Sequence, residues 1–130
     1  MKNTFVFHKL QVWHLAKALV KDIYALTKRF PEEEKFGLVA QINRAAISVA
    51  SNIAEGSGRI SRKDQAHFTQ LSYGSLMEVA CQLEIAEDLG FITEDELQMV
   101  SESIKTIAEK LSALRSSQLS SLSTQQAPKR

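Results

Sequence analysis

Residues 41–56, QINRAAISVASNIAEG, decide how this chain folds, because they carry two kinds of side chain at one helical spacing. Apolar residues recur every three or four positions and predict a helix with a buried face. Polar residues recur at the same spacing, and we call these the polar stripe: Gln41, Arg44, Ser48, Asn52 and Glu55. A solvated face would carry more Lys and Glu, so we interpret the stripe as a packing and assembly surface.

The whole chain favours helices. Its 130 residues are enough for one domain, and only 5 Gly and 2 Pro interrupt them. β-Branched residues never form alternating runs, so strands are not indicated. We therefore predict an all-α protein, an antiparallel up-and-down four-helix bundle.

The periodicity and the breakers place these helices. They are expected at about 9–29, 37–55, 61–89 and 93–115, within a bundle over 9–115. Residues 1–8 are expected to form an extended arm that packs on the bundle. The polar, low-complexity residues 116–130 are expected to be a disordered tail.

Local signals predict the helix ends. Ser61 is placed to cap the third helix, and Thr93 with Glu96 forms a capping-box pattern at the start of the fourth. The GSG at 56–58 should end the second helix through a glycine in the left-handed conformation.

Catalytic and metal-binding chemistry is not indicated. His8, His14 and His67 have no metal-type spacing to one another or to Cys81, which we interpret as a buried apolar residue. The GSGR that begins at Gly56 lacks the lysine of a phosphate-binding loop and follows a helix. We predict no enzymatic activity, no cofactor and no metal.

The expected location is the cytoplasm. A single cysteine excludes an internal disulfide and suits a reducing compartment. No apolar run reaches the roughly 18–20 residues of a membrane span, and no signal-peptide pattern is present at the start.

Charge is distributed unevenly. The net charge is +1, but residues 1–65 carry +5 and residues 66–130 carry −4. Six basic residues are candidates for nucleic-acid binding: Lys17, Lys21, Lys28, Arg59, Arg62 and Lys63. The alternative is an ordinary solvated face. It is favoured because no series of exposed aromatic residues accompanies these charges.

The predicted third helix contains a possible mate for the polar stripe. Gly74 lies in its middle, where glycine costs about 1 kcal/mol relative to alanine, so a packing reason is expected. In an antiparallel pair, Arg44 would lie near Glu78 or Gln82 and form a partly buried, charge-assisted contact that fixes register. The same surface could instead meet another subunit.

Three segments carry a resemblance to a known family. LQVWHLAKALVKDIYALTKRFP, FGLVAQINRAAISVASNIAEGSGR and FTQLSYGSLMEVACQLEIAEDLGFI resemble the bacterial four-helix-bundle family of 23S rRNA intervening-sequence proteins. This family includes the accessory protein of diversity-generating retroelements. The resemblance spans residues 7–114, and NIAEG with GSLxE is its most specific part. The chain differs by having Asn43 and Ala50 where many relatives have arginine and proline.

The resemblance implies a cytoplasmic bundle that forms a ring-shaped homopentamer. It also implies possible binding of nucleic acid or a partner protein, although the family's retroelement member has a far more basic surface. Our leading hypothesis is a homo-oligomeric scaffold or adaptor whose assembly residues are those of the polar stripe with Gly74 and Glu78. The alternative is an RNA- or DNA-binding accessory protein, and a small-molecule site in a ring pore or between helices is a weaker third.

Overall fold

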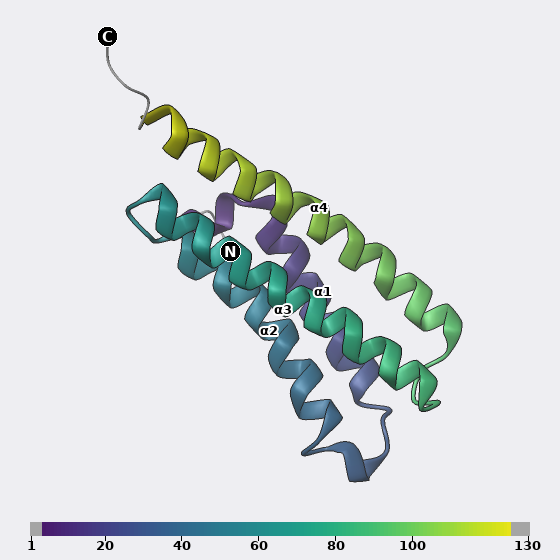
Figure 1. Ribbon diagram of the computed structural model, residues 1–130. Coiled ribbons are helices and arrows are strands. Elements are labelled where there is room, and N and C mark those ends of the chain that lie inside the picture. Colours follow the sequence, from purple (N-terminus) through teal and green to yellow (C-terminus); the bar gives the residue numbers. More distant parts are fainter. Residues whose placement is uncertain (1–3, 126–130) are drawn as a thin grey trace.

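The computed structural model describes residues 4–125, with side chains for residues 4–120. Four α-helices follow one another over this part of the chain: α1 (Gln11–Thr27), α2 (Leu38–Ser57), α3 (Arg62–Asp88) and α4 (Glu94–Gln125). Two short 3-10 helices, η1 (Val6–Lys9) and η2 (Glu32–Glu34), precede α1 and α2. No strand occurs among the described residues. The four helices run antiparallel to their chain neighbours and form a bundle (Figure 1), as predicted.

The core is built from the apolar stripe of each helix. In α1 and α2 the buried residues recur at three- and four-residue spacing, so each helix turns one face inward. The largest fully buried side chains come from all four helices: Leu19, Ile23, Ile42, Val49, Leu76, Val79, Leu83, Ile107 and Leu111. Helices α1 and α3 are not neighbours and lie diagonally across this core.

The predicted N-terminal caps are confirmed. The Ser61 hydroxyl accepts a hydrogen bond from the Asp64 N–H at 3.0 Å. At the start of α4 the Glu96 N–H donates to the Thr93 hydroxyl at 3.1 Å, and the Thr93 N–H donates to the Glu96 carboxylate at 2.9 Å. Both helix starts are therefore held by the residues that the sequence indicates.

The predicted left-handed end of α2 is wrong. Gly58 has φ −90°, in the right-handed region, and Gly90 after α3 is the glycine with positive φ, +81°. Gly56 instead serves close packing. A Cβ added to it would lie 2.8 Å from the Cβ of Phe68, so α2 and α3 approach too closely at this point for any larger residue.

Both chain ends differ from the prediction. Residues 6–9 form η1 rather than an extended arm, since the ring nitrogen Nδ1 of His8 accepts backbone N–H bonds from Thr4 and Phe5 at 3.2 and 3.1 Å. Residues 1–3 lie outside the described part.

Disorder of residues 116–125 is contradicted, because α4 continues to Gln125. Gln118 extends the buried stripe of α4 at 6% exposure and accepts a hydrogen bond from the Thr69 hydroxyl at 2.8 Å. The hydrogen-bonded amide of Gln118 therefore occupies a core position, although the polar composition of this segment predicted disorder. Residues 126–130 lie outside the description.

Candidate functional site

The middle of the polar stripe packs against α3 within the same chain. The hydroxyls of Ser48 and Ser75 are hydrogen-bonded at 2.8 Å, and the Asn52 amide donates to the Ser48 hydroxyl and carbonyl at 2.9 Å. Beside them, the fully buried Ser72 hydroxyl donates to the Val49 carbonyl at 2.7 Å. Small hydroxyl side chains therefore join two closely spaced helices, which is the internal half of the predicted packing role.

The predicted contact of Arg44 is absent among the described side chains. The Gln82 amide donates to the Gln41 side chain at 3.2 Å and to the Glu78 carboxylate at 3.1 Å, in the place where Arg44 was expected. Arg44 is exposed and has neither an ion pair nor a hydrogen bond from its side chain to any of those residues. It does line a small cavity of about 170 Å³ with Gln41 and Glu78. The arginine side chain is long enough to stay in water while the shorter amide reaches across.

The far end of the stripe is solvent-exposed. Glu55 forms an ion pair at 2.8 Å with Arg59, one helical turn later, and the Arg59 guanidinium stacks over the Phe68 ring at 4.5 Å. An exposed pair of this kind contributes little to stability, so Glu55 and Arg59 mainly order the turn into α3.

Gly74 has no packing partner within the subunit. A Cβ added there would meet no atom within 4 Å outside its own stretch of helix. Three apolar side chains on the same outer side of α3 are exposed: Leu71 at 42%, Met77 at 38% and, three turns after Gly74, Ile85 at 44%. We call these residues with Gly74 and Glu78 the outer α3 face, and no described part of the chain covers it.

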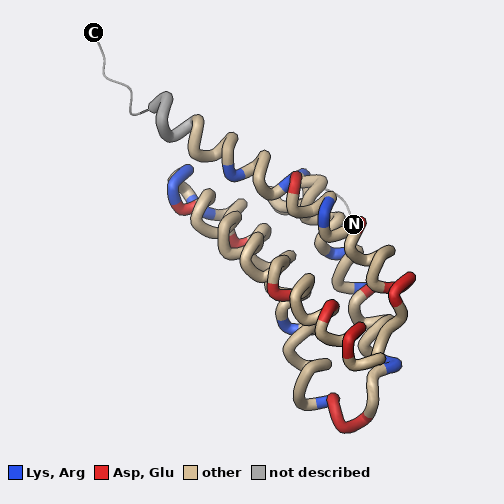
Figure 2. Tube along the Cα trace, turned by 45° about the vertical axis from the view of Figure 1, so that its right-hand side comes forward, with Lys and Arg blue, Asp and Glu red and all other residues tan. Residues whose placement is uncertain are grey.

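The candidate basic residues form two groups. Lys17, Lys21 and Lys28 are exposed along α1, whereas Arg59, Arg62 and Lys63 surround the α2–α3 turn. Figure 2 shows basic residues gathered at that turn and acidic residues along the rest of α3. Lys17 lies on the α1 edge that faces α2, where its ammonium stands 5.4 Å from the Trp13 ring centre.

An aromatic cluster next to Lys17 was missed by sequence reasoning. Phe5 stacks on Phe7 with centroids 5.8 Å apart, and Phe7 and His8 both contact Trp13. The cluster forms because residues 6–9 fold as η1 against α1; the sequence analysis predicted that this arm packs on the bundle but not that it forms a helical turn. Phe5 is more than half exposed.

The histidines have structural contacts. His8 is buried and stabilises η1, and the Nε2 of His14 is 2.7 Å from the His8 carbonyl oxygen. His67 lies against Phe68. Among the described residues, no three His, Cys, Asp or Glu side chains are grouped so as to hold a metal ion. Cys81, predicted as buried, is exposed on α3.

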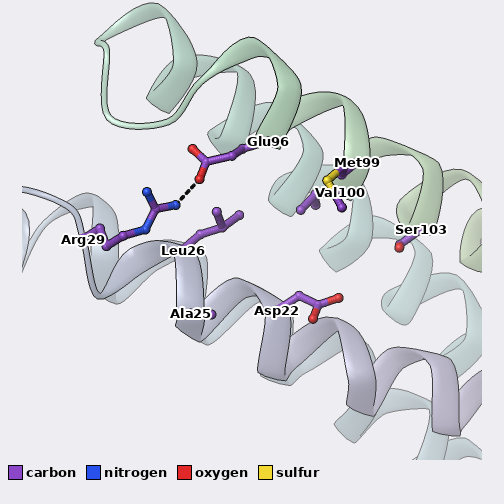
Figure 3. Close-up of a pocket in the computed structure, with 8 residues that line it drawn as sticks. All are labelled: Asp22, Ala25, Leu26, Arg29, Glu96, Met99, Val100 and Ser103. Atoms are coloured by element: carbon purple, nitrogen blue, oxygen red, sulfur yellow. Dashed lines mark hydrogen bonds and ion pairs between the residues drawn. The ribbon is translucent and has the colours of Figure 1, made fainter.

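A groove of about 380 Å³ lies between α1 and α4. Figure 3 shows Asp22 and Ser103 at one end and Arg29 with Glu96 at the other, above an apolar floor that includes Leu26 and Val100. Sequence analysis did not single out this groove, because its residues come from helices that are far apart in the chain.

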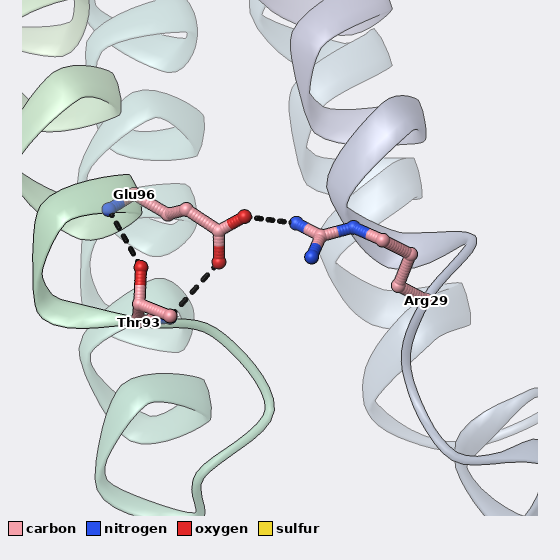
Figure 4. Close-up of polar contacts among 3 residues, drawn as sticks. All are labelled: Arg29, Thr93 and Glu96. Carbon is pink, nitrogen blue, oxygen red and sulfur yellow. Dashed lines mark hydrogen bonds and ion pairs between the residues drawn. The ribbon is translucent and has the colours of Figure 1, made fainter.

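An ion pair closes one end of that groove. Arg29 binds Glu96, whose other oxygen is held by the capping bond from Thr93 (Figure 4). The Thr93 N–H first, and then the Arg29 guanidinium, lower the pKa of Glu96 below its ordinary value. The arrangement joins α1 to the start of α4.

Within the described part of the chain, none of the helices is both long enough and apolar enough to cross a membrane.

Comparison with known proteins decides the family, because residues 8–113 match the family described as 23S rRNA-intervening sequence protein. The chain belongs to the 23S rRNA-intervening sequence protein family. This confirms the resemblance carried by the three sequence segments.

One solved structure is similar to this chain in fold. It is the crystal structure of a protein of unknown function from the S23 ribosomal protein family of Bacteroides thetaiotaomicron VPI-5482. The two are 22% identical with a TM-score of 0.75, over 80% of this chain and 97% of the other. No curated protein matches the chain.

Proposed function

We propose that this protein is a non-enzymatic scaffold or adaptor that assembles in the cytoplasm as a homopentameric ring. The observation that carries the proposal is the outer α3 face. Its exposed Leu71, Met77 and Ile85 share one side of α3 with a mid-helix glycine that nothing described in the subunit requires. Exposed apolar side chains gathered on one face are typical of protein interaction sites, and glycine allows another backbone to approach closely. The number five comes from the family resemblance.

The polar stripe supports the same proposal in a more limited way. The Ser48 hydroxyl, to which Asn52 donates within α2, is hydrogen-bonded to Ser75 and so joins α2 to the helix that carries the outer α3 face. Arg44 has no partner among the described side chains and lies at the edge of this surface beside Glu78, where it is available to a neighbouring subunit.

Native mass spectrometry of protein purified from its host tests the proposal. We expect a species of five subunits, retained at moderate salt and free of nucleic acid. A monomer at micromolar concentration in light scattering would overturn it. A ring that also carries a second protein would identify the partner of the adaptor.

A second candidate function is RNA or DNA binding. The observation that favours it is the aromatic cluster of Phe5, Phe7 and Trp13 beside Lys17, because stacking surfaces next to positive charge suit unpaired bases. Fluorescence anisotropy with a labelled single-stranded RNA tests it. Binding should weaken steeply from low to moderate salt and be lost in Lys17→Glu, while the exposed Lys105→Glu on α4 serves as the charge-matched control.

A further inference from the structure

The outer α3 face combines exposed apolar side chains with the acidic Glu78, and further acidic residues follow on α3. Beyond the first turn of α3 all the charged residues are acidic: Glu78, Glu84, Glu87 and Asp88. Figure 2 shows the acidic residues of α3 gathered in the part of the helix away from the basic α2–α3 turn. A partner surface for this face must therefore combine an apolar centre with positive charge.

The same subunit carries a surface of that description on α1 and α2. A groove of about 350 Å³ runs between these helices, with Val20, Ile47 and Ala50 among its apolar lining residues. Lys17 lines it too, and Lys21 and Lys28 follow along the exposed side of α1. Small residues, Ser51 and Ala54, complete the α2 side and leave room for an incoming helix.

We infer that the outer α3 face of one subunit docks into the α1–α2 groove of a second copy of this chain. Leu71, Met77 and Ile85 would meet the apolar groove, and the acidic residues would meet the α1 lysines. The inference rests on the proposed homo-oligomer and names the two surfaces that build it. Since these surfaces differ, the contact is head-to-tail, the type that generates rings or filaments.

Two variants, each blocked on one surface, test the inference. Gly74→Lys with Ile85→Lys blocks the outer α3 face, and Ile47→Lys with Ser51→Arg blocks the groove. All four positions are exposed or open, so the fold should persist, which far-UV circular dichroism checks. Every change adds positive charge, so the two blocked surfaces repel each other and cannot restore the contact. Met99→Lys, at 73% exposure on α4, is the matched control.

Sedimentation velocity and native mass spectrometry should give a ring for the wild type and for Met99→Lys, and monomers for each double variant. An equimolar mixture of the two double variants should give a 1:1 heterodimer and nothing larger, because one intact groove meets one intact α3 face. A wild-type ring with no heterodimer in the mixture, or with rings formed by either double variant, would overturn this inference and leave the proposed assembly standing. A monomeric wild type would overturn both.

Discussion

Two glycines in helices should respond in opposite directions to the same substitution. Gly74→Ala adds a methyl group where no atom lies within 4 Å, so only the helix propensity changes. We expect it to raise the free energy of unfolding by about 0.5–1 kcal/mol. Gly56→Ala gains at most a similar amount, since Gly56 is in the last turn of α2.

At Gly56 a steric term dominates. The new Cβ would lie 2.8 Å from the Cβ of Phe68 and 3.4 Å from the carbonyl oxygen of Gln65, so α2 and α3 must separate. Overpacking of this kind costs about 1–3 kcal/mol. Gly56→Ala should therefore lower the free energy of unfolding by about 1–2 kcal/mol, whereas Gly74→Ala raises it. The free energies of unfolding of the two variants should differ by about 2 kcal/mol.

Urea unfolding followed by far-UV circular dichroism measures this difference. Assembly would make the midpoint depend on protein concentration, so both variants are compared in an Ile85→Lys background at two concentrations. Equal stabilisation by both substitutions would refute the close approach of α2 and α3 at Gly56. Destabilisation by Gly74→Ala in that background would refute the open surroundings of Gly74.

Three further outcomes are expected. Ser72→Ala should lower the free energy of unfolding by about 1 kcal/mol in urea titrations, because a buried hydrogen bond to the α2 backbone is lost. The folded-state pKa of Glu96 is lowered, so its contribution to stability is present above its unfolded value and is lost as the pH falls through the folded one. Unfolding midpoints from pH 7 to 3 should therefore fall less steeply in Glu96→Gln than in the wild type. Gln118→Ala should destabilise α4 by about 1 kcal/mol, and amide hydrogen exchange at residues 116–120 should become faster, because the buried bond that joins α4 to Thr69 is lost.

Local signals were sufficient for the elements themselves. A helix start depends on a side chain and a backbone N–H three residues apart, so Ser61 and Thr93 could be recognised without any tertiary information. The buried stripes of α1 and α2 follow from helical geometry in the same way, because spacing alone places residues on one face. The bundle class follows from four such stripes joined by short connections.

Contacts between helices were settled only by the tertiary structure. The sequence placed Arg44 near Glu78 and Gln82, but it is Gln41 that bonds Gln82 across the α2–α3 spacing, while Arg44 stays exposed. That spacing also makes Gly56 a packing residue and leaves Gly74 open, although both are glycines in helices. The sequence pattern assigned Gln118 to a polar tail, because its hydrogen-bond partner Thr69 is far away in the chain. The periodicity of a helix defines which side chains share a face, but the identity and distance of what covers that face are properties of the packed bundle.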